Sequence, residues 1–162
     1  MREQLLGALA LASLAACGEE NTLAGSAGED FPLEFSKVNV TRSATALVIS
    51  YERPAGNGVD TIAKVNLDLA VAPVADNVKK GGRVSLQPDP PEQARATVTR
   101  QVVGDQRLNF PPVTRGSVTF DEIGETSGSK AAGTFHILFG LGGDGAAGKT
   151  LNGTFEAAVT KL

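Results

Sequence analysis

A two-residue alternation of apolar and polar side chains is the feature that most restricts the fold of this chain. In KVNLDLAV, residues 64–71, every second position is apolar: Val65, Leu67, Leu69 and Val71. Successive side chains of a β-strand point to opposite faces of the sheet, so a period of two predicts a strand with one buried face. The same pattern recurs in TALVISYE (45–52), GRVSL (82–86), ARATVTRQVV (94–103) and GSVTFDEI (116–123).

The last third of the chain repeats a short motif. GSVTF (116–120), AGTFHILF (132–139) and NGTFEAAV (152–159) each place glycine and a small polar residue ahead of an alternating run. Glycine-rich stretches separate the three segments, which favours an antiparallel meander. Helices are expected in only two places, PVADNVKKGG (73–82) and DPPEQA (89–94), with at most two turns each.

These segments together predict a single all-β domain at residues 31–162, with about seven to nine strands. So many strands do not fit one open sheet in a domain of this size. We therefore expect an antiparallel β-sandwich of two layers. A closed barrel is the alternative fold.

The first sixteen residues have a different composition from the rest. Arg2 precedes a run of twelve apolar and small residues, Leu5 to Ala16. A membrane-spanning helix needs about 20 apolar residues, so this run is too short to be an anchor. It is typical of a cleaved secretory signal peptide, which we place at residues 1–16. The alternative is a buried N-terminal helix with an apolar face of leucines.

Leu14, Ala15, Ala16 and Cys17 resemble the lipobox of bacterial lipoproteins. The resemblance implies that the signal peptidase recognises Leu14, Ala15 and Ala16 and cuts before Cys17. The Cys17 sulfur then carries diacylglycerol, and its new amino group is acylated as well. Two or three acyl chains give stable membrane anchoring, where one is marginal. Lipidation also accounts for the single cysteine of an exported chain, because it leaves no lone thiol.

The residue after the cysteine bears on the destination. In that family an aspartate at this position holds the protein at the inner membrane, whereas this chain has Gly18. The resemblance therefore implies an exported protein anchored in the outer membrane of the cell envelope.

Residues 17–30 comprise Cys17 and the polar stretch GEENTLAGSAGED, which contains one leucine and no aromatic residue. Such a stretch buries too little apolar surface to offset its ordering entropy. We expect a flexible tether with a root-mean-square span of about 20 Å. The folded domain should then stand clear of the lipid headgroups.

The Gly-Thr-Phe triplets at 133–135 and 153–155 are similar to those of small cell-envelope lipoproteins of myxobacteria and related groups. Those proteins are largely of unknown function. The resemblance covers only the end of the chain, and it implies a fold and a location rather than an activity.

GDGAAGKT, residues 143–150, fits the phosphate-binding pattern G-x-x-x-x-G-K-[ST]. That cradle requires a helix directly after it, whose N-terminal amides bind the phosphate. Here Asn152 and Gly153 would break a helix, and the residues that follow alternate as in a strand. We interpret the segment as a flexible hairpin loop between two strands and expect no nucleotide or other cofactor. The glycine turn at 142–145 is similar to a calcium-binding turn, but it occurs once and needs no ligand.

Other residue types that support catalysis or metal binding are scattered. His136 is the only histidine, and the alternation places it on the face opposite Phe135 and Ile137. Asp121, Glu122 and Glu125 are interpreted as solvated acids at a strand end, since adjacent strand residues point to opposite faces. Lys79 and Lys80 are interpreted as turn residues. We therefore predict neither a catalytic group nor a metal site.

The charges are dispersed and the net charge is −3, so no basic stripe is present to bind nucleic acid. The expected function is that of a lipid-anchored envelope protein with a structural, adhesive or binding role, which is not an enzyme. Its expected partners are the membrane, through the lipid on Cys17, and an envelope protein or glycan. One alternative is a module that binds carbohydrate or another small ligand. The other is an enzyme, either a nucleotide hydrolase using residues 143–150 or a hydrolase using acids such as Asp121.

Overall fold

The computed structural model describes residues 20–106, 109–142 and 145–162, and these fold almost entirely into β-strands. The strands are β1 (Thr22–Ala24), β2 (Lys37–Arg42), β3 (Ala46–Ala55), β4 (Gly58–Asp68), β5 (Arg83–Ser85), β6 (Ala96–Gln101), β7 (Val113–Ile123), β8 (Lys130–Phe139) and β9 (Thr150–Lys161). Two single-turn helices accompany them, the 3-10 helix η1 (Ser26–Glu29) and α1 (Ala72–Ala75). The all-β class and the predicted number of strands are confirmed.

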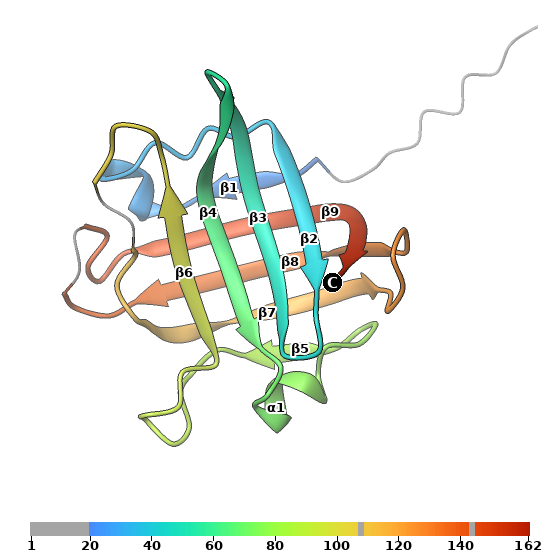
Figure 1. Ribbon diagram of the computed structural model, residues 1–162. Coiled ribbons are helices and arrows are strands. Elements are labelled where there is room, and N and C mark those ends of the chain that lie inside the picture. Colours follow the sequence, from blue (N-terminus) through green and yellow to red (C-terminus); the bar gives the residue numbers. More distant parts are fainter. Residues whose placement is uncertain (1–19, 107–108, 143–144) are drawn as a thin grey trace, which may run out of the picture.

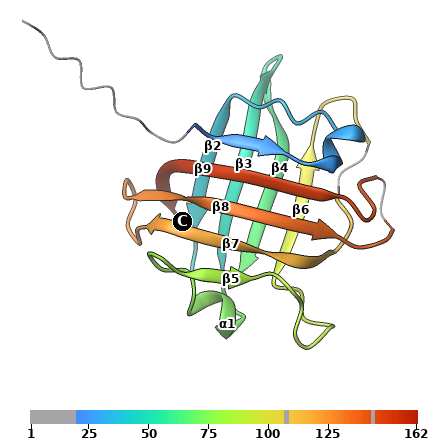
Figure 2. The same ribbon diagram turned by 180° about the vertical axis from the view of Figure 1, so that it is seen from behind.

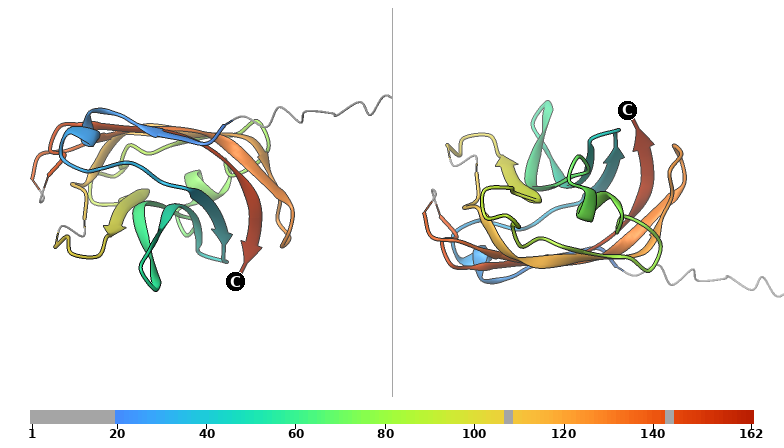
Figure 3. Two further views of the ribbon diagram at one scale, coloured as in Figure 1. Left: turned by 90° about the horizontal axis from the view of Figure 1, so that it is seen from above. Right: turned by 90° about the horizontal axis from the view of Figure 1, so that it is seen from below.

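The strands form two layers that cross each other. Strands β2, β3, β4 and β6 make one layer, and β1, β9, β8, β7 and β5 run across behind it (Figures 1 and 2). Seen from above and below, one continuous sheet curls from the second layer into the first (Figure 3). Strands β7, β8 and β9 are antiparallel neighbours, so the predicted meander is confirmed.

Strand β9 joins the two layers. Its residues Thr150 to Ala158 pair antiparallel with β8, whereas Val159 to Lys161 pair in parallel with β2. The sheet is therefore mixed, which differs from the wholly antiparallel sandwich expected from the sequence. The reason is that β9 has twelve residues and bends, so its two parts have different neighbours.

The curled sheet is a half-barrel that does not close. Its terminal strands are β5 and β6, and an isolated bridge, Thr99 with Asn109, joins β6 to the residues that precede β7. Phe110 donates its N–H to Val98 O at 3.3 Å beside this bridge and is buried there. The open side is thus covered by the residues that lead into β7, and the fold lies between the expected sandwich and the alternative barrel.

The core lies between the layers, and the side chains that the alternation assigns to it form a large part of it. Leu47, Ile49 and Tyr51 of β3 are fully buried, as are Val118 and Phe120 of β7. In β4 the alternation holds through Leu67, and the strand ends at Asp68, before the predicted Val71. Burial of one face of each strand therefore supplies most of the apolar surface removed from water.

Two local predictions need correction. Strand β2 was not predicted, although KVNVTR alternates in the same way. Residues 89–94 form turns rather than a helix, with Gln93 donating its N–H to Pro90 O. A six-residue segment gains too few internal hydrogen bonds to nucleate a helix on its own.

The prediction of a flexible tether at residues 17–30 is wrong for the part that the structure describes. Strand β1 pairs antiparallel with β9, with Thr22 opposite Thr154 and Ala24 opposite Asn152. Ala27 of η1 is fully buried, and the segment runs directly into the buried Phe31. The low apolar content of this segment was misleading, because hydrogen bonds to the edge of β9 order it together with the few side chains that it buries.

Candidate functional site

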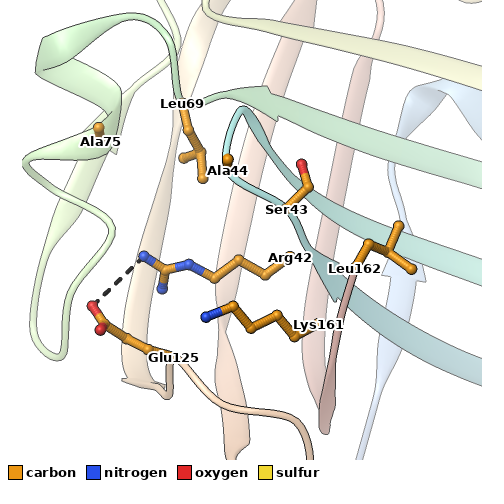
Figure 4. Close-up of a pocket in the computed structure, with 8 residues that line it drawn as sticks. All are labelled: Arg42, Ser43, Ala44, Leu69, Ala75, Glu125, Lys161 and Leu162. Atoms are coloured by element: carbon orange, nitrogen blue, oxygen red, sulfur yellow. Dashed lines mark ion pairs between the residues drawn. The ribbon is translucent and has the colours of Figure 1, made fainter.

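A pocket that contains two basic side chains lies where β2 and β9 end. Its volume is about 370 Å³, within the range of small-ligand pockets. The pocket is lined by Arg42, Ser43, Ala44, Leu69, Ala75, Glu125, Lys161 and Leu162 (Figure 4). These residues come from five separate parts of the chain, which the fold brings together.

The parallel pairing of β2 and β9 positions the two cations. Arg42 is directly opposite Lys161 in the register, and Leu162 donates its N–H to Arg42 O at 2.9 Å. Neighbouring strands are about 4.8 Å apart, so the two side chains start close together. Figure 4 shows both running in the same direction, toward Glu125.

The surrounding backbone is held by hydrogen bonds. The Ser43 hydroxyl accepts the N–H of Ala46 at 3.0 Å, which fixes the turn between β2 and β3. Leu69 donates its N–H to Thr45 O at 2.9 Å, and Lys161 donates its own N–H to the Ser127 hydroxyl at 3.0 Å. The wall of the pocket is therefore formed before any ligand arrives, which lowers the entropic cost of binding.

The charges of the pocket are only partly compensated. Arg42 Nη2 lies 3.7 Å from Glu125 Oε1, beyond hydrogen-bond distance, and the Glu125 side chain is 81% exposed. Arg42 Nη1 is buried and has no hydrogen-bond partner among the described residues. Lys161 likewise forms no side-chain ion pair within the described part of the chain. Two basic side chains thus face one hollow in which Glu125 is the single acidic side chain among the lining residues, an arrangement suited to holding an anion.

The glycine loop at 143–150 joins two strands, as predicted. Strand β8 ends at Phe139 and β9 begins at Thr150, so a strand rather than a helix follows the Lys149-Thr150 pair. Gly143 and Asp144, two residues of the calcium-like turn, lie outside the described residues. The helix N-terminus required by a phosphate cradle is thus missing after Thr150.

The lysine of this loop is bound to the N-terminal segment. Lys149 Nζ lies 2.9 Å from Glu29 Oε2 and 3.0 Å from Asp30 Oδ2. These hydrogen bonds to the two carboxylates raise the pKa of Lys149. Asp30 also accepts the N–H of Ala146 at 2.7 Å. The loop and the N-terminal segment thus hold each other in place, so Lys149 has a structural role in this fold.

The other residues considered from the sequence are spread over different parts of the structure. His136 is exposed on β8, as predicted, and its Nδ1 is hydrogen-bonded to Asn152 Oδ1 on β9. Asp121 is exposed on β7, and Glu122, which follows it where the register with β8 shifts, is half-buried. Lys79 and Lys80 are exposed in the turn after α1. Of these candidates, only Glu125 belongs to the pocket.

The aromatic side chains are directed into the molecule. All seven phenylalanines and the single tyrosine lie in the described residues, and each is buried or half-buried. A platform of exposed rings, on which a sugar stacks, is therefore missing from the described surface.

A separate group of charged residues is buried near the tip of β4. Asp60 is 4% exposed, and its Oδ1 accepts the N–H of Val103 at 2.8 Å. Its Oδ2 accepts Arg53 Nε at 3.2 Å. The Val103 hydrogen bond, followed by that of Arg53 and the charges of Arg53 and Arg100, lowers the pKa of Asp60. This group stabilises the connection that follows β6.

Asp60 makes the stability depend on pH. Since its folded-state pKa is lowered, its contribution is complete above the unfolded value of about 4 and is lost as the pH falls through the folded value. We expect Asp60→Asn to lower the urea midpoint at neutral pH and to weaken the further loss on acidification. Asp121→Asn, an exposed carboxylate on β7, is the control. Identical acid dependence in the parent protein and Asp60→Asn would contradict this role.

The predicted lipidation site, Cys17, lies outside the described residues, as do Leu14, Ala15 and Ala16 of the predicted peptidase recognition site. Among the residues that are described, no helix is long and apolar enough to cross a bilayer. The same residues contain no group of three or more acidic, histidine or cysteine side chains placed to hold a metal ion.

Comparisons with protein-family models, curated proteins and solved structures find no match to this chain.

Proposed function

We propose that this chain is a lipid-anchored binding protein of the bacterial cell envelope, attached through Cys17. The observation that carries the proposal is the pattern of Leu14, Ala15, Ala16 and Cys17, which resembles a lipobox. An acylated N-terminal cysteine with two or three chains is a stable membrane anchor. The cationic pocket, which has donors but no nucleophile paired with a base among the described residues, supports binding rather than catalysis.

The position at which the fold begins bears on how close to the membrane the anchored domain would lie. Glu20, three residues after Cys17, already lies against the domain, because its carbonyl oxygen accepts the Thr154 hydroxyl at 2.8 Å. Asn21 follows with hydrogen bonds to the backbone of Glu156. A lipid on Cys17 would thus hold the domain directly against the membrane surface. This differs from the distance of about 20 Å that a free tether would allow.

Metabolic labelling with palmitate tests the anchor. We expect the wild-type protein to incorporate label and to fractionate with membranes. Cys17→Ala should incorporate none, because it lacks the sulfur that receives the lipid and the cysteine before which the peptidase cuts. Wild-type protein that carries no label, or that retains Met1, would contradict the proposal.

A second variant tests the destination within the envelope. Gly18→Asp introduces the residue that holds bacterial lipoproteins at the inner membrane. We expect the labelled protein to move from the outer-membrane to the inner-membrane fraction, with the amount of label unchanged. Wild-type protein found in the inner-membrane fraction would reject the outer membrane as the destination, and equal distribution of the two proteins would show that residue 18 does not set it.

A further inference from the structure

We propose that the pocket between Arg42 and Lys161 binds a phosphate group. The first argument is an unused donor. Arg42 is largely buried, with 19% of its side chain exposed, and its Nη1 has no hydrogen-bond partner among the described residues. A guanidinium that is largely out of water and has no close anion is costly, so an anion that reaches the pocket-lining part of Arg42 would be bound favourably.

Glu125, the acidic side chain nearest to Arg42, pairs only weakly with its guanidinium. Glu125 Oε1 stays 3.7 Å from Arg42 Nη2, and most of the Glu125 side chain is in water. An exposed pair at this distance contributes little and is screened by salt. The Glu125 side chain can therefore move away from Arg42 when an anion that hydrogen-bonds to Arg42 enters the pocket.

The second argument is the neighbouring cation. Arg42 and Lys161 are directly paired across two strands, and like charges in such a position repel each other. Both side chains extend into the same hollow (Figure 4). An anion bound between them would remove the repulsion and would hydrogen-bond to both.

The number of donors favours phosphate over a single carboxylate. A phosphate group has three free oxygens and carries up to two negative charges, so it can accept from the guanidinium fork and from the ammonium group together. A carboxylate has two oxygens, and a fork-like pair with Arg42 uses both. Leu69, Ala44 and Ala75 add an apolar side to the pocket, which fits a phosphate carried on an organic group.

Two sources present this group, a soluble phosphate monoester and the headgroup of phosphatidic acid, whose phosphate is also a monoester. Inorganic phosphate tests the first, and vesicles that contain phosphatidic acid, compared with vesicles of phosphatidylcholine alone, test the second. The site itself does not depend on the lipid at Cys17. A negative result of the labelling experiment would therefore not count against phosphate binding. Absence of phosphate binding would not count against lipidation.

Binding is measured on the purified full-length protein by calorimetry for phosphate and by co-sedimentation for vesicles. We expect Arg42→Gln to weaken binding at least about tenfold and Lys161→Gln about threefold to tenfold, because charge-assisted hydrogen bonds are lost. Lys64→Gln removes an exposed lysine on β4 and should change nothing. Urea midpoints of all variants show whether each one is folded.

Glu125→Gln separates a binding site from a structural ion pair. It removes the competing carboxylate, so we expect phosphate to bind severalfold more tightly, whereas a merely structural role predicts no gain. Binding in either arm that Arg42→Gln weakens and Glu125→Gln strengthens supports the site. Absence of binding in both arms would overturn it, as would binding that neither substitution changes.

Discussion

Replacing Tyr51 with alanine is expected to lower the free energy of unfolding by about 3 to 5 kcal/mol, the usual cost of removing a large buried aromatic ring. Tyr51 of β3 is fully buried. Its ring packs edge-on against Phe35 at 4.9 Å and against Phe135 of β8 at 5.9 Å. Because β3 and β8 belong to different layers, the substitution leaves a cavity between them. Urea unfolding followed by circular dichroism measures the loss.

Tyr51→Phe is the matched control, since it keeps the ring and removes only the hydroxyl. The hydroxyl donates to Thr154 O on β9 at 2.8 Å, so we expect a loss of about 1 kcal/mol. Equal losses for the two variants would contradict the role of the ring in joining the layers.

The tyrosine also provides a second measurement. Burial raises the pKa of Tyr51, and the chain contains no other tyrosine. The hydroxyl of Tyr51 ionises near pH 10 in the unfolded chain but stays neutral at that pH in the folded chain. The stability that Tyr51 contributes is therefore lost as the pH rises above about 10 toward the pKa of the folded state. Tyr51→Phe should remove this alkaline dependence.

Replacing Gly25 with alanine is expected to cost about 2 to 4 kcal/mol, the second large effect. Gly25 has φ of +132°, and a Cβ there would lie 2.3 Å from Thr150 O. The substitution therefore strains the backbone and pushes the N-terminal segment away from β9. If residues 17–30 were a free tether, alanine would be tolerated. The urea midpoint distinguishes the two cases.

Gly104→Ala is the control that measures the cost of placing alanine at a positive φ without a steric contact. Gly104 has φ of +82°, and nothing lies within 4 Å of its Cβ position. We expect a loss of about 1 kcal/mol from the unfavourable φ alone. A loss at Gly25 no larger than that at Gly104 would mean that contact with β9 contributes nothing.

The fold class could be predicted from the sequence because alternation is a local property. Val65 and Leu67 face the core for the same reason that Lys64 faces water, and neither depends on which strands are neighbours. Strand order is not local. The parallel contact of β2 with β9 follows from the bend in β9, and nothing in the residues of either strand indicates it.

The N-terminal segment shows the limit of composition as evidence. Its sequence contains one leucine and many small or polar residues, which is typical of a disordered linker. Its order comes from partners more than a hundred positions away, such as the pairing of the Thr22 and Thr154 hydroxyls at 3.0 Å. An available strand edge can order a polar segment that could not fold alone.

The pocket was missed for a related reason. Arg42 ends an unpredicted strand, and neither Arg42 nor Lys161 lies within one of the sequence motifs considered above. The conspicuous motif, GDGAAGKT, instead leads into a strand, and its lysine is bound to Glu29 and Asp30. Only the register of β2 and β9 brings the two cations together.

Amide hydrogen exchange of residues 22–31 tests most directly whether the fold begins beside Cys17. Asp30 and Phe31 both donate to Ala27 O, at 3.1 and 3.0 Å, and β1 is paired with β9. We predict exchange at least about tenfold slower than in an unstructured peptide, because these amides open only when the segment leaves the sheet. Exchange at the unstructured rate throughout these residues would contradict this prediction and would restore the flexible tether.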